Sequence, residues 1–543
     1  MLRARWLGRV PYREALALQH ALFDHGQEQH LLLLEHPHVF TYGPRAELEK
    51  NLKCDPAAVG ADFVEVKRGG DITYHGPGQL VGYPILNLDN RIGASQHVCV
   101  IEQILIDTLA RIGLPNAGRL PDYPGVWLDV DSDRPRKIAA IGVRLANGRT
   151  MHGFALNVNT DLTFMREHIV PCGIGDRPVT SIREEGIDID LRTVVDLIVE
   201  RAAESWGPVE RQDVAWIHRP EDLSAFSRGD GPGEPVRLLR RLDAAGVNES
   251  VALTDRKPEW LRPKVQLGEE VLRVKSTLRS LELVTVCEEA GCPNLSECWK
   301  DGTATFMVLG ERCTRACGFC LVDTRKPLAP ALDEPDRVAS AVAAMGLEHA
   351  VLTMVARDDL DDGGFAHVAK CVEAIRDRVP GARIETLVSD AKGEQSSLEL
   401  LFAAQPDVFN HNIETVARLQ RAVRPSAGYA RSLGVLARAK AAGLVTKSGL
   451  VLGMGETPEE VDGCLADLAS VGVSIVTIGQ YLRPTTNHLP VSRWIHPDEF
   501  ARWKQVGESL GIAHVESSPL TRSSYHARQS AEEAVPVSIG VRR

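Results

Sequence analysis

Six of the eleven cysteines of this chain lie within residues 287–320. They form two triads, Cys287, Cys292 and Cys298, followed by Cys313, Cys317 and Cys320. A disulfide framework is typical of small secreted domains. This chain has 543 residues, and its first residues carry charges with no apolar stretch of secretory length behind them. We therefore expect the clustered thiols to bind metal.

Charge and apolar patterning argue against two classes of partner. The net charge is −11, whereas a general nucleic-acid binder needs surplus cations to displace counterions from phosphates. No run approaches the roughly 20 apolar residues that cross a bilayer. The run from 341 to 356 is interrupted by Glu348, His349 and Thr353. We expect a cytoplasmic protein that binds neither nucleic acid nor membrane.

A region rich in turn formers and charges divides the chain. Residues 216–250 lose long apolar periodicity, and 227–235 reads Ser-Arg-Gly-Asp-Gly-Pro-Gly-Glu-Pro, which is typical of a linker. We expect one domain at 1–215 and another at 251–543. Within the second, segment 251–300 contains the first cysteine triad and residues 301–543 form the main fold.

The second domain alternates strand-like and helix-like segments. Helical patterns lie at 338–345, 365–379 and 459–470, and Thr457 and Glu460 have capping-box spacing around Pro458. Such alternation predicts a parallel sheet, and six units are too few for a closed eight-unit barrel, so we expect a partial (β/α)6 TIM-type barrel. Ligands then bind at the carboxyl ends of the strands. The strands are expected at 305–310, 349–355, 383–388, 407–410, 445–452 and 474–478.

The first domain has a mixed pattern. Strands are expected at 30–35 and 80–86, and an amphipathic helix at 98–112. Residues 138–144 and 153–158 read as a strand pair joined by Asn147-Gly148. This combination predicts an α+β domain within a chain that is α/β as a whole.

The second cysteine triad has the spacing C-x3-C-x2-C directly after a predicted strand. Four thiolates complete a ferredoxin-type cluster, so three leave one iron open to a small chelating molecule. The alternative, a structural zinc loop, lacks the second C-x2-C knuckle that would complete its ligands. The motif resembles the radical S-adenosylmethionine superfamily. That resemblance implies a 4Fe–4S cluster on Cys313, Cys317 and Cys320, whose open iron binds S-adenosylmethionine for cleavage to a 5'-deoxyadenosyl radical.

The first triad, with C-x4-C-x5-C spacing, resembles lipoyl synthase. The likeness covers about residues 256–527 and includes Arg357-Asp-Asp-Leu, Phe409-Asn-His-Asn-Ile-Glu-Thr and Arg522-Ser-Ser-Tyr. It implies an auxiliary 4Fe–4S cluster, the sulfur donor, on Cys287, Cys292, Cys298 and Ser524. An isolated Ser-Ser pair would otherwise be a polar surface turn. An alkoxide is a poorer ligand for cluster iron than a thiolate, which suits a cluster that is dismantled.

Four polar residues at predicted strand ends are candidates for holding S-adenosylmethionine or the substrate. They are Arg357, Asp359, Asn410 and Lys447. The alternative is that they form ion pairs that close the loops of the barrel, and the sequence leaves both interpretations open.

Two segments of the first domain place polar groups among glycines. Lys67-Arg-Gly-Gly-Asp-Ile-Thr-Tyr-His-Gly-Pro-Gly-Gln79 allows the backbone to approach a ligand, although by itself it reads equally well as a turn. Ile169-Val-Pro-Cys-Gly-Ile-Gly175 places a thiol on a predicted turn, although an isolated cysteine is more often a small core residue.

Together with Lys137-Ile-Ala-Ala-Ile-Gly-Val-Arg144, these segments resemble lipoyl(octanoyl) transferase over about residues 30–182. The resemblance implies a biotin/lipoate ligase-like fold and catalysis by Cys172 and Lys137. A thiolate attacks an acyl thioester, and an adjacent ammonium stabilises the thiolate and protonates the departing thiol. Without the resemblance, Lys137 reads as part of a solvated basic run after Arg134. The implied acyl pocket contains Arg68, Gly69, Gly70, Asp71, Ile72, Thr73, Tyr74, His75, Ala140, Ile141, Gly142, Gly153, Phe154 and Ala155.

The two resemblances imply one enzyme for both steps of lipoyl cofactor assembly. Octanoyl passes from acyl carrier protein through Cys172 to a lysine of a lipoyl domain of a 2-oxoacid dehydrogenase complex or of the glycine-cleavage H protein. Sulfur then enters at C6 and C8, with two 4Fe–4S clusters, S-adenosylmethionine and an electron donor such as ferredoxin or flavodoxin. The alternatives are a silent half that only binds carriers, and a radical enzyme that inserts sulfur into another substrate.

Overall fold

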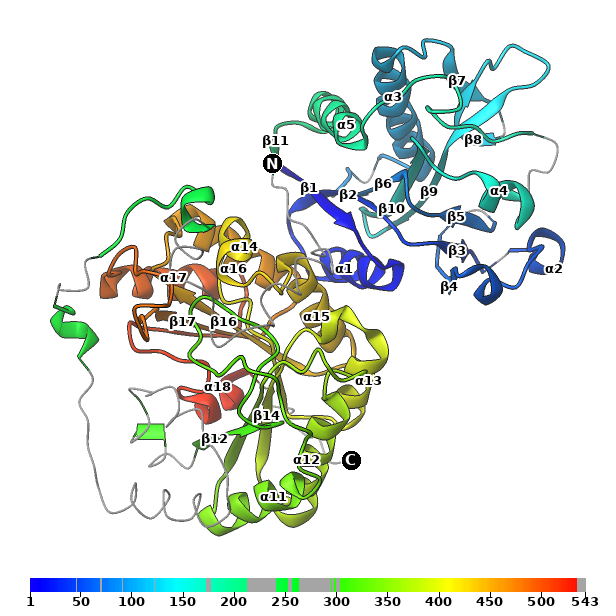
Figure 1. The fold of residues 1–543 in the computed structure, drawn as a ribbon. Coiled ribbons are helices and arrows are strands. Elements are labelled where there is room, and N and C mark those ends of the chain that lie inside the picture. Colours follow the sequence, from blue (N-terminus) through cyan, green and yellow to red (C-terminus); the bar gives the residue numbers. More distant parts are fainter. Residues whose placement is uncertain are drawn as a thin grey trace, which may run out of the picture. The chain divides into compact units, whose positions relative to one another are not determined.

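The chain divides into two compact units, Met1–Ile217 and His218–Arg543 (Figure 1). In the part of the chain that the structure describes, no helix is both long and apolar enough to span a bilayer. This computed structural model describes residues 1–44, 46–68, 71–89, 91–121, 123–171, 177–211, 241–251, 256–262, 294, 297–298 and 303–534.

The first unit contains a mixed eight-stranded sheet with the order β11-β1-β2-β6-β10-β9-β8-β7 and a small sheet with the order β4-β3-β5. The sequence predicts this α+β architecture, and the structure confirms it. The strands are β1 (Leu2–Arg9), β2 (Gln29–Glu35), β3 (Val39–Tyr42), β4 (Asp62–Glu65), β5 (Thr73–His75), β6 (Gln79–Ile85), β7 (Ala117–Leu120), β8 (Tyr123–Leu128), β9 (Arg136–Ala146), β10 (Arg149–Asn157) and β11 (Val209–Arg211).

Helices pack on the large sheet of the first unit. α3 and α5 cover an apolar core that includes Leu33, Leu156 and Ile198, while α1 lies against β6 and β10 on the other side (Figure 1). The predicted helix at 98–112 is α3, which begins four residues earlier. The helices are α1 (Tyr12–Asp24), α2 (Leu48–Asn51), α3 (Ala94–Ile112), α4 (Thr163–Glu167) and α5 (Leu191–Trp206).

The hairpin formed by β9 and β10 positions the candidate site of this unit. Asn147 and Gly148 have φ values of 52° and 73°, the left-handed conformation that a tight two-residue turn requires at both positions. The strands pair in an antiparallel register that sets Gly153 opposite Gly142. The predicted strand pair and its turn are therefore confirmed.

The second unit contains a parallel seven-stranded sheet with the order β12 to β18. All six predicted strands are present, and the seven-stranded parallel sheet is consistent with a partial barrel. The sequence analysis missed the seventh strand because its four residues, His-Val-Glu-Ser, include one aliphatic side chain. The strands are β12 (Thr303–Val308), β13 (His349–Met354), β14 (Arg383–Leu387), β15 (Val408–Asn410), β16 (Val445–Leu452), β17 (Ile475–Gln480) and β18 (His514–Ser517).

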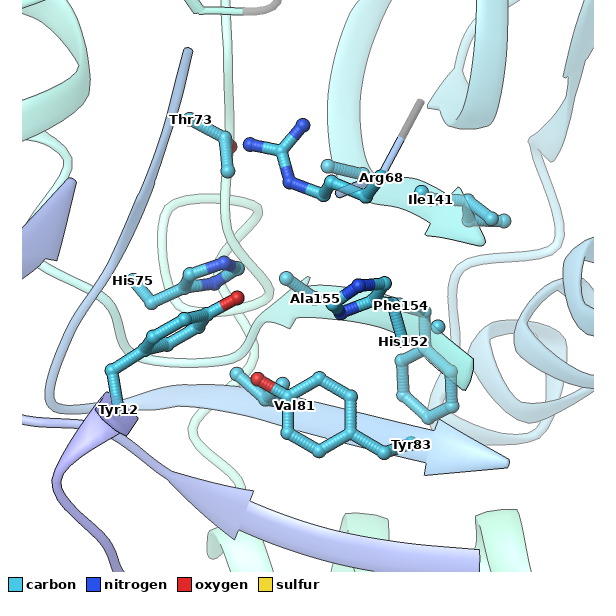
Figure 2. A pocket seen from close by; sticks show the side chains of 13 residues that line it. Tyr12, Arg68, Thr73, His75, Val81, Tyr83, Ile141, His152, Phe154 and Ala155 are labelled. Carbon is cyan, nitrogen blue, oxygen red and sulfur yellow. The ribbon is translucent and has the colours of Figure 1, made fainter. Parts of the chain in front are cut away.

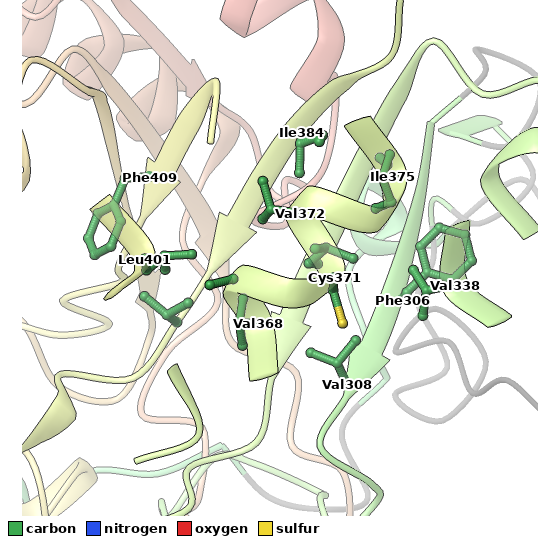
Figure 3. Packing of buried hydrophobic residues seen from close by; sticks show 14 of the residues in the cluster. Phe306, Val308, Val338, Val368, Cys371, Val372, Ile375, Ile384, Leu401 and Phe409 are labelled. Atoms are coloured by element: carbon green, nitrogen blue, oxygen red, sulfur yellow. The ribbon is translucent and has the colours of Figure 1, made fainter. Parts of the chain in front are cut away.

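Apolar side chains of the sheet and helices form the core of this unit. Phe306, Ile384 and Val372 meet where α11 to α13 pack on the sheet (Figure 3). The predicted capping box is present, because Glu460 N donates to Thr457 Oγ1 (3.3 Å) and Thr457 N donates to Glu460 (3.0 Å). The helices are α11 (Glu334–Met345), α12 (Phe365–Arg378), α13 (Gln395–Ala403), α14 (Gln420–Val423), α15 (Tyr429–Ala441), α16 (Pro458–Ser470), α17 (Pro497–Ser509) and α18 (Ala527–Ala534).

Residues 241–250, placed in the linker from sequence, pack on the second unit. Leu242 and Val247 are buried, and Arg418 donates a hydrogen bond to Ala245 O. Val251 N donates to Val491 O (2.7 Å). Residues 212–240 lie outside those that the structure describes.

Candidate active sites

A pocket lies over the strands of the first unit beside the start of α1. Two rows of paired residues across neighbouring strands form its floor. In one row Val81 pairs with Ala155, and Ala155 pairs with Ala140. In the other row Gly153 pairs with Gly142. Alanine and glycine leave space above the strands. Figure 2 shows aromatic and imidazole rings from α1, β5, β6 and β10 around that space. The lining residues are Tyr12, Arg68, Thr73, His75, Val81, Tyr83, Ala140, Ile141, Gly142, His152, Gly153, Phe154 and Ala155.

The structure brings most of the predicted acyl-pocket residues together around this space. Tyr74 and Ile72 instead belong to an apolar core, because neighbours on a strand point to opposite faces and Thr73 and His75 take the pocket side of β5. Asp71 accepts a hydrogen bond from Asn51 Nδ2 (2.8 Å). Gly69 and Gly70 lie outside the described residues. Acyl binding by the lining residues stays a prediction.

The sequence analysis missed four lining residues, Tyr12, Val81, Tyr83 and His152. Val81 and Tyr83 occupy alternate positions of the predicted strand at 80–86, so the period of two could have assigned them to one face. Tyr12 comes from a helix distant in sequence, and no local signal marks it.

The walls of the pocket are largely uncharged. Burial lowers the pKa of both His75 and His152 to about 3 and that of His36, behind the wall, to about 4. Burial raises the pKa of Tyr12 to about 12. Arg68 is the one charged side chain among the described lining residues, and backbone carbonyl oxygens accept its hydrogen bonds. A neutral wall suits an uncharged acyl chain.

Lys137 lies on β9, three residues before Ala140, and is only 7% exposed. Its ammonium lies over the Trp127 ring, 5.3 Å from the centroid. A Cβ at Gly125 would lie 2.8 Å from Lys137 Cε, and Gly125 has a φ of 126°, so a side chain there would be strained and would displace the lysine. Burial argues against the interpretation of Lys137 as part of a solvated basic run.

Described residues on both sides of Cys172 are hydrogen-bonded within the first unit. Lys137 N donates to Pro178 O (2.9 Å), and Thr180 N donates to Lys137 O (2.9 Å). On the other side, Val170 N donates to Asn51 O (2.8 Å). Cys172 itself lies outside the described residues, so its pairing with Lys137 stays a prediction.

The second candidate site begins with Cys313, Cys317 and Cys320 on the loop after β12, where the parallel strands end. Thr314 N donates to Ala356 O after β13 (2.9 Å). The three cysteines form no disulfide, and burial, followed by the nearby Cys317 thiol, raises the pKa of Cys313 to about 11. Burial also raises the pKa of the other two. Three neighbouring soft donors fit an iron–sulfur cluster, which binds cysteine as thiolate.

No three His, Cys, Asp or Glu side chains in the described part of the chain are placed to hold a single metal ion. A cluster takes its thiolates at different irons. The three thiols of the cysteine loop therefore suit a cluster and not a single metal ion, and the cluster on them stays a prediction.

Arg315 lies between two of these cysteines and is buried in an ion-pair network. Its guanidinium donates to Asp358 (2.7 and 2.8 Å) and pairs with Asp390 (2.7 Å). Asp390 also pairs with Arg431 (3.2 Å). Burial would raise the pKa of Asp390, but Arg315 and Arg431 lower it far below its usual range. The network attaches the cysteine loop to the ends of β13 and β14.

Replacing Asp390 with asparagine is expected to lower the free energy of unfolding by about 3–5 kcal/mol, because two buried guanidinium groups lose their shared carboxylate. Urea unfolding of the intact chain followed by circular dichroism measures the change. Asp336→Asn is the matched control, since its pair with Arg378 is exposed and is worth at most about 1 kcal/mol. Equal effects of the two substitutions would contradict the role given to Asp390.

The four candidate S-adenosylmethionine contacts are engaged with protein groups. Arg357 pairs with Asp359 (2.9 Å). Lys447 pairs with Glu385 (3.0 Å), and both are fully buried, while Asn410 Nδ2 donates to the same carboxylate (2.8 Å). The ion pairs of the alternative interpretation are thus present. Contact of these side chains with S-adenosylmethionine stays a prediction, and Glu385 was not among the predicted residues.

The segment around Cys298 contacts the C-terminal motif. Asn294 Nδ2 donates to Leu520 O (2.7 Å), and Tyr525 OH donates to the Glu297 carboxylate (3.2 Å). Cys298 is buried and lines a pocket together with residues of α18. One predicted ligand of the auxiliary cluster therefore lies beside the motif that contains another.

Ser524 lies within that motif, next to Ser523, which accepts a hydrogen bond from Asn412 Nδ2 (2.7 Å). A buried thiol and a nearby serine are compatible with the predicted mixed ligand set. Cys287 and Cys292 lie outside the described residues, so the complete set stays a prediction.

Comparison with protein families gives three matches. Residues 11–203 match the lipoyl protein ligase A/B catalytic domain. Residues 240–292 match the N-terminal domain of lipoyl synthase, and residues 307–468 match the radical SAM superfamily. The matched ranges contain the pocket of the first unit and both cysteine triads, except for Cys298.

Two relatives agree with the match to lipoyl synthase. Lipoyl synthase of Rubrobacter xylanophilus is 53% identical over 288 residues, which cover 53% of this chain and 90% of the relative. Lipoyl synthase of Kineococcus radiotolerans is 49% identical over 291 residues, covering 54% and 86%. Among solved structures, a bipartite lipoate protein ligase from Thermoplasma acidophilum matches with a TM-score of 0.35 and 18% identity, covering 40% of this chain and 87% of that chain.

The homologous region covers most of the length of each of these two synthases. The chain therefore belongs to the lipoyl synthase family, and it carries a catalytic domain of the lipoyl protein ligase A/B type in front of the synthase domain.

Proposed function

We propose that this chain builds the lipoyl cofactor in two steps on one carrier protein. Residues 1–215 transfer octanoyl from acyl carrier protein to a carrier lysine, and residues 251–543 insert sulfur at C6 and C8 of that octanoyl chain. The carriers are lipoyl domains of 2-oxoacid dehydrogenase complexes and the glycine-cleavage H protein. The product of the first site is thus the substrate of the second.

The transfer step uses Cys172 and Lys137. The Cys172 thiolate attacks the thioester carbonyl, and the bond to the acyl carrier sulfur breaks as Lys137 gives that sulfur a proton. The carrier amine then attacks the new thioester and gives a proton to the neutral Lys137. The Cys172 thiolate leaves, so both residues return to their starting states.

The second site holds its cofactors through thiols. Cys313, Cys317 and Cys320 would hold the cluster that binds S-adenosylmethionine, and a second 4Fe–4S cluster would bind Cys287, Cys292, Cys298 and Ser524. Together these groups would supply hydrogen abstraction and sulfur, chemistry that side chains lack. Arg315 positions the cysteine loop through its carboxylate partners, and ferredoxin or flavodoxin supplies electrons.

One observation carries the transferase assignment. The chain that follows Cys172 is hydrogen-bonded to the backbone of Lys137, and this buried lysine lies on the same strand as Ala140 on the floor of the pocket. These contacts support a site in which a cation, a thiol and a largely uncharged pocket act together, as acyl transfer through a cysteine requires.

The test combines both steps in one anaerobic incubation. The intact chain is mixed with octanoyl-acyl carrier protein, an unmodified lipoyl domain, reductant and S-adenosylmethionine, and the mass of the domain is followed. We expect addition of one octanoyl group, then replacement of two hydrogens by two sulfurs. Without S-adenosylmethionine only the octanoyl form is expected.

Two other outcomes would contradict the proposal. A lipoyl domain that gains no acyl group would indicate that the first half only binds carriers. An octanoylated domain that gains no sulfur, while S-adenosylmethionine is cleaved, would indicate that the second half acts on another substrate.

A further inference from the structure

The acyl pocket has a reactive end that hydrogen bonds identify. Thr180 N donates to Lys137 O (2.9 Å), and Asn157 Nδ2 donates to Thr180 O (2.9 Å). The chain that follows Cys172 therefore returns near the start of β9 and the end of β10. From this end the floor runs past Ala140 to Gly142, which lies about 17 Å along the strand from Lys137 at about 3.4 Å per residue.

The opposite end of the floor carries two rings, those of Tyr83 and His152. Gly153 and Gly142 occupy the last floor row, and His152 is the next residue of β10. We propose that Tyr83 and His152 close the pocket here and limit the length of the acyl chain that the first site accepts. This inference rests on the proposed octanoyl transfer.

The backbone of His152 explains how its ring comes to line the pocket. Strict alternation would place His152 on the face of Leu156, which belongs to the apolar core. Its φ is 62°, a left-handed conformation that interrupts the alternation, and Figure 2 shows the imidazole among the lining rings. Its N–H is held by Gln19 Oε1 of α1 (3.0 Å). Costly conformations of this kind persist where the surroundings fix them and cluster at functional sites.

Tyr83 is held equally firmly. Its hydroxyl is hydrogen-bonded to His36 Nε2 (2.7 Å), and the other ring nitrogen of His36 is hydrogen-bonded to Val10 O (2.7 Å). The phenol is buried. This chain of hydrogen bonds ends on the backbone. Moving the Tyr83 ring to admit a longer acyl chain would therefore break a buried hydrogen bond.

The wall stops an acyl chain by its shape. His152 is uncharged at neutral pH, because burial lowers its pKa to about 3, and its Nδ1 is buried without a hydrogen-bond partner among the described residues. On this proposal an eight-carbon chain ends before the two rings, and a longer chain must displace them.

The experiment compares octanoyl-, decanoyl- and dodecanoyl-acyl carrier protein as donors to a lipoyl domain, with the intact chain and an intact-mass readout. For the unmodified protein we expect dodecanoyl to have a kcat/KM at least about tenfold below that of octanoyl, the scale at which a filled pocket discriminates methylene groups. Tyr83→Ala is expected to bring the two donors within about threefold.

Three further variants keep the test decisive. Tyr83→Phe retains the ring but removes the hydroxyl that is hydrogen-bonded to His36, so its chain-length preference should lie between those of the unmodified protein and Tyr83→Ala. His152→Gly removes the other ring and suits a φ of 62°, because glycine adopts positive φ without strain. It should relax the preference even if Tyr83→Ala does not fold. His97→Ala, which removes a buried imidazole outside the lining, should leave the preference unchanged.

The outcomes separate this inference from the function on which it rests. Octanoyl transfer with an unchanged preference in folded Tyr83→Ala and His152→Gly would overturn the inference and leave the function standing. Failure of the unmodified chain to transfer octanoyl at all would overturn the proposed function instead.

Discussion

Replacing Lys137 with methionine is expected to lower the rate of octanoyl transfer by about 10²–10⁴-fold, the range for loss of a positioned acid or base. Methionine has a similar length and suits the buried site beside Trp127, so the fold should persist. The variant removes the ammonium that, on the proposed mechanism, stabilises the Cys172 thiolate and protonates the departing thiolate. Initial rates from octanoyl-acyl carrier protein to a lipoyl domain, followed by intact mass, measure the loss.

Arg134→Met is the matched control, because Arg134 is an exposed cation near Lys137 in sequence. Its transfer rate should equal that of the unmodified chain. Alkylation of Cys172 by iodoacetamide should also shift to higher pH in Lys137→Met, since the thiol loses a neighbouring positive charge. Equal rates in the two variants would show that Lys137 is only part of a basic run.

Replacing Cys313 with alanine is expected to abolish cleavage of S-adenosylmethionine while leaving part of the iron in place. Two 4Fe–4S clusters amount to about eight irons per chain, and loss of one leaves about four. Cys287→Ala should also retain about four irons but should keep the cleavage activity. Iron and sulfide analysis of anaerobically purified protein, together with release of 5'-deoxyadenosine, measures both quantities.

Cys371→Ala controls for the loss of a thiol as such, because Cys371 is buried in α12, within the apolar core of the second unit. It should bind the full complement of iron and cleave S-adenosylmethionine normally. About four irons in the unmodified chain, or cleavage that does not depend on Cys313, would refute the assignment of two clusters with separate duties.

Most of the fold could be predicted because local patterns and tertiary structure agree. The Asn147-Gly148 turn, the Thr457–Glu460 capping box and the strand–helix alternation each depend on residues close in sequence. β18 was not predicted, because edge position and pairing with β17 make it a strand despite its weak apolar pattern. Tertiary context decides such short segments.

The candidate sites were predictable where they depend on contiguous motifs. The cysteine loop and the lysine of β9 stand in such motifs, whereas Tyr12 and Tyr83 reach the acyl pocket from separate elements. His152 follows no rule of alternation, because its left-handed backbone redirects the ring. The partners of Arg315 are also remote in sequence, so only the folded chain reveals which carboxylates neutralise it.

The ion pairs of Arg315 have a consequence for the order in which this protein matures. Asp358 and Asp390 hold the loop between Cys313 and Cys317 through contacts that involve no iron. Small zinc domains, in contrast, gain their structure only as the metal binds. We therefore expect the cysteine loop to take its shape before iron and sulfide bind, so that a lost cluster can be replaced without unfolding the domain that holds it.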